Sequence, residues 1–258
     1  MRYDMEKAEW LAEEKREFRG WDFSSLDGRW ESAPLPWSYA EMIHQYLKPI
    51  DDLLDMGTGG GEFLLTLGHP AEKTSVTEAW PPNVALLRER LAPMGIRVYE
   101  VEDGENASLP IEDNSFDVVI NRHESYTLSE VKRVLRPGGY FITQQVGGEN
   151  VYEFVQRIVP GYSPPYAGFS PASELPKFTA NGFTVLRSEE CFVTLRFFDV
   201  GAFVYWAKVL PWVFPGFSVE THFDALCAMR EEILRNGFVR GRQHRFLIVA
   251  KQERKYAE

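Results

Sequence analysis

The stretch Leu53-Leu54-Asp55-Met56-Gly57-Thr58-Gly59-Gly60-Gly61-Glu62-Phe63 decides the fold of this chain. An apolar run over residues 50–54 predicts a short strand that ends in an acid, and a helix is expected to begin at Glu62. The glycines at 57, 59 and 61 alternate, so a ligand can approach the backbone of the turn closely. The dinucleotide fingerprint places its third glycine where this chain has Glu62, which disfavours a nicotinamide or flavin site.

The next predicted strand also ends in an acid. Residues 74–77 predict a strand, and Glu78 follows it, 23 positions after Asp55 and 17 after Gly61. In an open α/β sheet, an acid at the tip of the second strand accepts hydrogen bonds from the ribose hydroxyls of a nucleoside. The two acids and the glycine turn therefore point to a ligand that contains a nucleoside.

The composition bounds the possible partners. The chain has 258 residues, 44% hydrophobic and 26% charged, which is typical of a globular protein with a sizeable core. Its net charge of -10 disfavours a polyanionic substrate, because nucleic-acid binding depends on basic surfaces. Five arginines lie within residues 230–245, and we interpret them as a solvated helix face and turn in preference to an RNA-binding patch.

Cysteine content and hydropathy indicate the compartment. We find no apolar run of about 18 residues or more, so no membrane span is expected. The first seven residues are charged and lack the apolar core of a signal peptide. Cys191 and Cys227 are too few for a disulfide framework and are expected to be reduced. A cytoplasmic protein, monomeric or homodimeric, is the expectation.

Two further motifs give the family resemblance. An acid-bearing loop, residues 102–108, precedes Leu109-Pro110 and then Asp113-Asn114-Ser115-Phe116-Asp117 at the start of a strand. A helix then ends at Val134-Leu135-Arg136-Pro137-Gly138-Gly139, where proline and glycine turn the chain back into the sheet. With the glycine turn, these motifs resemble the class I S-adenosylmethionine (SAM)-dependent methyltransferases over about residues 50–146.

The resemblance implies roles for particular residues. The acid and the glycine turn would hold the methionine end of SAM, and Glu78 would bind the ribose. Glu105, or Asp103 if the loop holds an insertion, would mark the edge of the adenine, and residues 121–123 would lie beside the sulfonium. The expected cofactor-binding residues are Asp55, Gly57, Thr58, Gly59, Gly61, Glu78, Ala79, Asp103, Gly104, Glu105, Asn121 and Arg122.

The chemistry of methyl transfer demands little of the protein beyond positioning. The sulfonium already activates the methyl group, so orientation and the exclusion of water supply most of the catalysis. A general base is needed only where the nucleophile must lose a proton. His123, Glu124 and Tyr126 follow the fourth strand and are the catalytic candidates, although His123 can instead pack against the cofactor or cap the next helix. The five scattered histidines do not have metal-site spacing, and we predict no metal.

Alternating strands and helices predict an α/β fold of parallel βαβ units. The resemblance implies a Rossmann-like sheet of seven mostly parallel strands, the last one antiparallel. We expect one domain over residues 1–258: a helical extension (1–48), a SAM-binding core (49–146) and a C-terminal half (147–258). Residues 199–237 lie between the sixth and seventh predicted strands. We interpret them as an inserted helical cap over the active site, and the alternative is a helical layer away from it.

The outer segments are expected to shape the acceptor site. An aromatic loop carries Trp21, Trp30 and Trp37, which either seal the sheet edge or line a ligand pocket. The function predicted is SAM-dependent methyl transfer to a small molecule. An RNA or protein methyltransferase and a non-catalytic SAM-binding protein are the alternatives.

Overall fold

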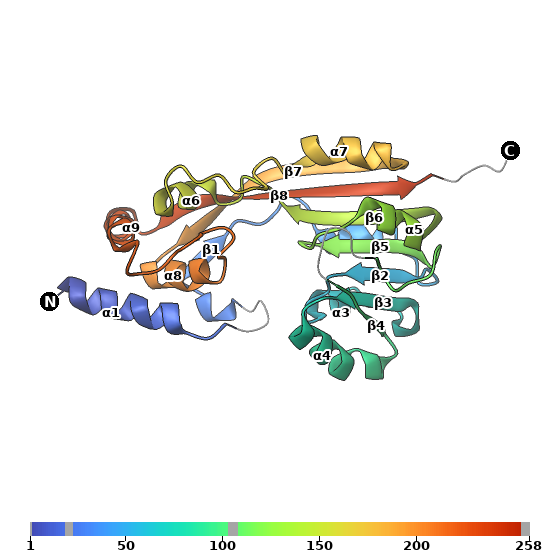
Figure 1. Cartoon of the computed structure of the whole chain (residues 1–258), viewed down its shortest axis with the longest axis horizontal. Helices are drawn as coiled ribbons and strands as arrows, with labels where there is room; N and C mark the ends of the chain where they lie inside the picture. The colour runs from blue at the N-terminus through green and yellow to red at the C-terminus, as the bar shows by residue number, and fades with distance from the viewer. Residues whose placement is uncertain (1, 19–22, 103–107, 254–258) are drawn as a thin grey trace. The chain divides into compact units, whose positions relative to one another are not determined.

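The structure is a computed structural model of the chain and describes residues 2–18, 23–102 and 108–253 (Figure 1). The chain divides into two compact units. The first unit comprises residues 1–35, 147–168 and 192–244, and the second comprises residues 36–146, 169–191 and 245–258. The expectation of a single domain with a cap over its site stays a prediction.

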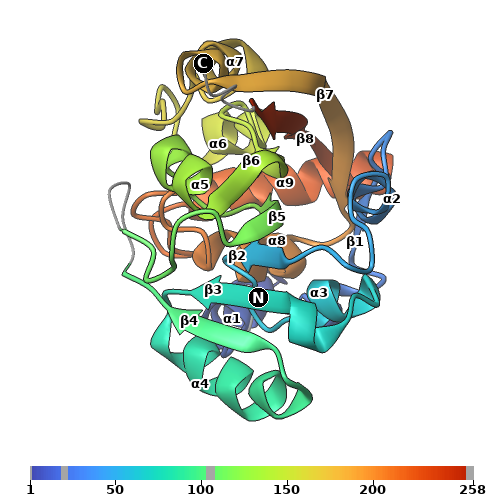
Figure 2. The ribbon, with the colours of Figure 1, turned by 90° about the vertical axis from the view of Figure 1, so that its right-hand side faces the viewer.

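The strands follow the order β1-β7-β8-β6-β5-β2-β3-β4. The neighbours β2–β3, β2–β5, β3–β4 and β5–β6 are parallel, and β6–β8 is antiparallel. Figure 2 shows β5, β2, β3 and β4 side by side. The strands are β1 (Trp30–Ser32), β2 (Leu53–Met56), β3 (Thr74–Glu78), β4 (Arg97–Glu100), β5 (Phe116–Arg122), β6 (Leu135–Val146), β7 (Phe183–Phe197) and β8 (Val239–Gln252).

The predicted Rossmann-like class with an antiparallel last strand is confirmed, with one strand more than the seven expected. The extra strand is β1, in the aromatic segment predicted to be a loop. Trp30 lies opposite Phe197 in the β1–β7 register, and the two rings are 6.0 Å apart. This ring contact anchors a short segment whose sequence shows no strand periodicity.

Helix α6 (Tyr152–Ile158) is an addition that the sequence patterns did not indicate. Residues 199–237, predicted to be helical, contain α8 and α9 between β7 and β8. The helices are α1 (Arg2–Lys15), α2 (Tyr39–His44), α3 (Glu62–Thr66), α4 (Pro81–Arg90), α5 (Leu128–Val134), α6 (Tyr152–Ile158), α7 (Pro171–Ala180), α8 (Val200–Lys208) and α9 (Phe223–Asn236). In the described part of the chain, no helix has the length and apolarity needed to cross a membrane.

One local expectation was wrong. The first strand begins at Leu53 and not at Ile50, which is 76% exposed. A turn precedes the strand, because Asp51 accepts a hydrogen bond from the backbone of Lys48 at 2.9 Å.

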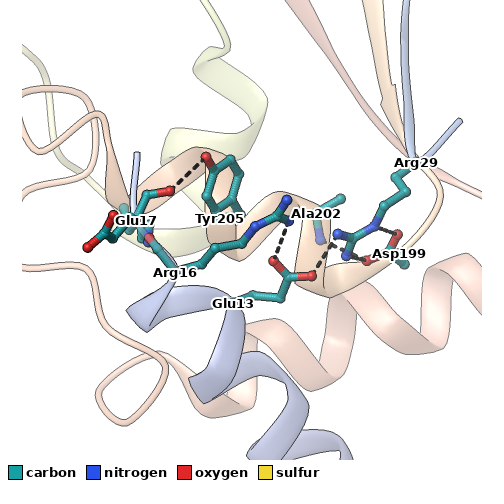
Figure 3. A network of polar contacts seen from close by, with 8 residues as sticks. Glu13, Arg16, Glu17, Arg29, Asp199, Ala202 and Tyr205 are labelled. Atoms are coloured by element: carbon teal, nitrogen blue, oxygen red, sulfur yellow. Dashed lines mark hydrogen bonds and ion pairs between the residues drawn. The ribbon is translucent and has the colours of Figure 1, made fainter. Parts of the chain in front are cut away.

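In the first unit, an ion-pair network joins α1 to the start of α8 (Figure 3). Asp199 caps α8 by accepting a hydrogen bond from the Ala202 amide at 2.7 Å. Arg29 donates to both oxygens of Asp199, at 2.6 and 2.9 Å, and to Glu13 at 2.6 Å. The carboxylates raise the pKa of Arg29 above its usual range, against the opposing effect of its burial. The network fixes the first turn of α8 against α1.

Candidate functional site

The glycine turn after β2 adopts a backbone that favours glycine. Gly57, Gly59 and Gly61 have φ of 65°, 63° and 79°, in the left-handed region. A Cβ on Gly57 would lie 2.3 Å from Cγ of Glu124, so this position has no room for a side chain. A Cβ on Gly59 would meet nothing within 4 Å. The turn is therefore packed at Gly57 and open at Gly59, where a ligand can reach the backbone.

Asp55 lies inside β2, directly before this turn, and is 5% exposed. The Thr58 hydroxyl donates a hydrogen bond to its carboxylate at 2.6 Å. Burial raises the pKa of Asp55 to about 7, because removal from water disfavours the charged form. The Thr58 bond and the charge of Arg122 oppose the shift, and the charge of Glu78 adds to it. Asp55 thus changes charge near neutral pH.

Glu78 ends β3 and is buried. One carboxylate oxygen accepts hydrogen bonds from the amides of Ala79 and Trp80, both at 3.0 Å. The other accepts from the Gly59 amide at 2.9 Å and from the Asn83 side chain at 3.3 Å. These bonds fix the carboxylate against the glycine turn.

One pocket collects several predicted residues in the second unit. Gly57, Glu78 and Ala79 line it, with the catalytic candidates Glu124 and Tyr126. Part of the remaining wall is apolar and is formed by Met56, Val101 and Leu109. An acid at the end of β3, with an apolar wall beyond it, matches the ribose and the flat base of a nucleoside. The residues present therefore fit a SAM molecule.

His123 follows β5 in a left-handed backbone conformation, with φ of 63°, which is uncommon outside glycine and frequent at functional sites. Its Nε2 lies 3.2 Å from Nε2 of Gln144. Desolvation and the positive charges of Arg245 and Arg122 lower its pKa to about 3. The residue keeps part of its surface in solvent, but any lowering from 6.5 leaves the ring neutral at pH 7.

The other residues around the end of β5 are held by neighbours. Asn121 is fully buried, and its side-chain oxygen accepts hydrogen bonds from Thr143 at 2.9 Å and Gln145 at 2.5 Å. The Tyr126 hydroxyl donates to the buried Glu174 at 3.0 Å, and burial raises the pKa of Tyr126 above its usual range. Neither side chain is arranged to take a proton from a substrate.

The structure brings together only part of the predicted set. Four of the predicted residues form or adjoin the turn without lining the pocket: Asp55, Thr58, Gly59 and Gly61. Arg122 lies over the ring of Phe63, with its guanidinium 4.2 Å from the ring centroid. Asp103, Gly104 and Glu105 lie outside the described residues, so the choice between the two adenine-edge acids stays a prediction. Across the described chain, no group of three or more His, Cys, Asp or Glu side chains is placed to hold a metal ion.

The sequence reasoning missed two residues that support this edge of the sheet, Tyr39 and Gln144. Trp37 donates from Nε1 to Oε1 of the buried Gln144 at 2.8 Å. The buried Tyr39 hydroxyl lies 2.9 Å from the carbonyls of both Asn121 and Ile142, between β5 and β6. Adjacent glutamines at the end of an otherwise apolar strand were the available signal, because buried amides need partners.

The sheet order and the site define a class I Rossmann-like methyltransferase fold. Solved structures share this fold. The structure of a candidate methyltransferase from Bacillus halodurans C-125 aligns with a TM-score of 0.56 and 17% sequence identity. The alignment covers 83% of this chain and 98% of that chain. A SAM-dependent methyltransferase from Methanosarcina mazei has a TM-score of 0.51 at 17% identity, with the same coverages of 83% and 98%. At this identity the likeness shows the fold alone.

Sequence comparison identifies the domain. Residues 54–143 match the family model described as a methyltransferase domain. A probable phthiotriol/phenolphthiotriol dimycocerosates methyltransferase 2 of Mycobacterium ulcerans (strain Agy99) is 42% identical over 94 residues, 33% of this chain and 34% of that protein. The fatty-acid O-methyltransferase of Mycolicibacterium smegmatis (strain ATCC 700084 / mc(2)155) is 34% identical over 91 residues, 33% of this chain and 32% of that protein. The chain spans about a third of the length of these relatives.

Residues 54–143 therefore match a methyltransferase domain, and the motifs that resemble the class I, SAM-dependent methyltransferases lie in the same part of the sequence. The matched segment begins in β2 and ends in β6, so it contains the glycine turn, Glu78 and the end of β5.

Proposed function

We propose that this protein transfers a methyl group from SAM to a small, lipid-like acceptor. The observation that carries the proposal is the contact between the glycine turn and Glu78. The Glu78 carboxylate accepts a hydrogen bond from the Gly59 amide at 2.9 Å. Bound SAM would supply an electrophilic methyl group. Glu78 would bind the ribose hydroxyls, which would replace part of its present hydrogen bonds. The amides of the turn would face the methionine end.

The acceptor class is inferred from the relatives. Their names refer to dimycocerosates and to a fatty acid. The matches span only 94 and 91 residues, about a third of each relative, so we carry over the kind of acceptor and not its identity. The cytoplasmic location and the monomeric or dimeric state expected from the sequence stay predictions.

The residues beyond β5 would position the acceptor. Tyr126 is committed to Glu174, and the neutral His123 is a weak base. Glu124 accepts hydrogen bonds from the amide and hydroxyl of Ser125, at 2.8 and 2.9 Å. This arrangement favours catalysis by orientation and exclusion of water over catalysis by a dedicated base.

The ion pairs of the C-terminal arginines argue against an RNA acceptor. Arg230 pairs with Glu6 and Glu231, and Arg242 pairs with Glu153. Acids of the chain itself therefore offset part of the positive charge that a phosphate backbone would need.

The test is incubation with SAM that carries a deuterated methyl group, with product detection by mass spectrometry. The panel contains a medium-chain fatty acid, the matching alcohol and amine, bulk tRNA and a mixed-protein extract. Labelled product from a lipid acceptor supports the proposal. Label confined to tRNA or protein contradicts it, and SAM binding with no labelled product in any arm favours a non-catalytic SAM-binding protein.

A further inference from the structure

Glu124 lies across the glycine turn. It follows the end of β5, and it lines the pocket together with Gly57 and Glu78. A Cβ added to Gly57 would lie 2.6 Å from Cβ of Glu124 and 2.9 Å from its Oε2. The Glu124 side chain therefore lies flat on the Cα of Gly57, and it has this place because residue 57 carries no side chain.

Buried amides hold the backbone that carries Glu124. Gln145 of β6 is 5% exposed, and its Nε2 donates a hydrogen bond to the Glu124 carbonyl at 3.0 Å. Asn121 of β5 is fully buried, and its Nδ2 donates to the Ser125 carbonyl at 3.4 Å. Both donors belong to the sheet, so the position of Glu124 over the turn is preorganised.

The two carboxylate oxygens of Glu124 have different surroundings. Oε1 accepts hydrogen bonds from the amide and the hydroxyl of Ser125, at 2.8 and 2.9 Å. Oε2 lies over Gly57, and in the part of the chain that the structure describes it accepts no hydrogen bond and contacts no cation. Because the side chain is exposed, a ligand in the pocket can reach this second oxygen.

The charge of Glu124 is not offset by a basic residue in the pocket wall. Among the described residues that line the pocket there is no Lys, Arg or His. Glu130, another acid of the wall, is paired with Arg133 at 2.7 Å. Arg122 lies over the ring of Phe63 and does not line the pocket. The wall at Glu124 therefore attracts positive charge.

The sheet order places the pocket residues in a row. The neighbouring strands β5, β2, β3 and β4 are followed at their carboxyl ends by Glu124, Gly57, by Glu78 at the tip of β3, and by Glu102 (Figure 2). In SAM the sulfur joins the ribose to the methionine chain. The proposed function assigns the ribose to Glu78 and the methionine end to the glycine turn, so an acid that lies on the turn is placed for the sulfur.

We infer that Oε2 of Glu124 faces the sulfonium of bound SAM and makes the pocket prefer SAM to S-adenosylhomocysteine. The inference rests on the proposed function. In methyl transfer the methyl carbon bonds to the acceptor as its bond to sulfur breaks, and the electron pair of that bond stays on sulfur. SAM therefore has a positive charge that S-adenosylhomocysteine lacks, while both keep the same amino and carboxyl groups. Glu124 attracts the cofactor and not the product, which favours product release.

Calorimetric titration of SAM and S-adenosylhomocysteine into the wild type and Glu124→Gln tests this preference. Glutamine keeps the shape of the side chain, and its oxygen can still accept the Ser125 hydrogen bonds. We expect SAM affinity to fall about three- to fivefold, the effect of one partly exposed ion pair, and S-adenosylhomocysteine affinity to change by less than about 1.5-fold. Raising NaCl from about 0.02 to about 0.5 M should reduce the preference of the wild type more than that of the variant.

Glu62→Gln is the matched control. Glu62 is an exposed acid at the start of α3, next to the same turn, but its charge is paired with Arg90 and it does not line the pocket. The ratio of the two dissociation constants should stay at the wild-type value in this variant.

Two results overturn the inference alone. One is an unchanged ratio of the two dissociation constants in Glu124→Gln. The other is an equal loss of affinity for both ligands, which would place Glu124 at the methionine amino group that both contain. Absence of binding of either ligand by the wild type overturns the proposed function and this inference together, so the two failures are distinguishable.

Discussion

Replacement of Asp55 by asparagine should stabilise the protein in a pH-dependent way. The carboxylate is buried, and its pKa rises from 3.8 to about 7 on folding. Because the folded value exceeds the unfolded one, the contribution of Asp55 to stability is complete below pH 3.8 and is lost as the pH rises through 7. A shift of about three units corresponds to about 4 kcal/mol at most. The amide of Asp55→Asn has no charge to bury, and its oxygen can still accept the Thr58 hydrogen bond.

Urea unfolding followed by tryptophan fluorescence, from pH 4 to pH 8.5, measures this difference. The free energy of unfolding of Asp55→Asn minus that of the wild type should be small near pH 4 and grow by at most about 1.4 kcal/mol per pH unit. It should level off above pH 7. Asp27→Asn, at an exposed aspartate, is the control and should show no such rise. A difference that does not vary with pH, or a variant less stable than the wild type at pH 8, would refute the reasoning.

Four further substitutions test other parts of the structure. Gly57→Ala should lower the free energy of unfolding by about 2–5 kcal/mol, and Gly59→Ala by only about 1–2 kcal/mol. Both glycines have positive φ, but only Gly57 is packed against a neighbouring side chain. Chemical denaturation measures both losses, and a larger loss for Gly59→Ala would contradict the packing described at Gly57. Gln144→Glu should raise the pKa of His123 in an NMR titration, since a carboxylate favours the charged ring; an unchanged or lower value would show that the two side chains do not interact. Asp199→Ala removes the α8 cap and should lower the free energy of unfolding by about 1–2 kcal/mol while SAM affinity is kept; an unchanged free energy would mean that the cap does not contribute.

The SAM-binding core was predictable because its motifs are local. Asp55, the alternating glycines and Glu78 are each recognised from a few neighbouring residues. Positive φ at three positions of the turn favours glycine, so the backbone conformation is visible in the sequence as Gly57, Gly59 and Gly61. The antiparallel last strand came from the resemblance alone, since nothing in residues 245–251 specifies its direction.

The supporting contacts could not be predicted because they join distant parts of the chain. Trp37 and Gln144 are 107 positions apart, and their hydrogen bond exists only once α2 packs against the sheet. Strand β1 likewise forms only by pairing with β7. The paired residues Glu31 and Arg196 are 165 positions apart in the sequence.

The central claim is that the glycine turn and Glu78 bind SAM, and a calorimetric titration tests it most directly. The wild type should bind both SAM and S-adenosylhomocysteine, and Glu78→Ala should bind them at least about tenfold more weakly through loss of the ribose hydrogen bonds. Glu100→Ala, at the exposed acid that ends the neighbouring strand, is the matched control and should bind like the wild type. Absence of binding by the wild type, or equal affinity of the Glu78→Ala variant, would contradict the account.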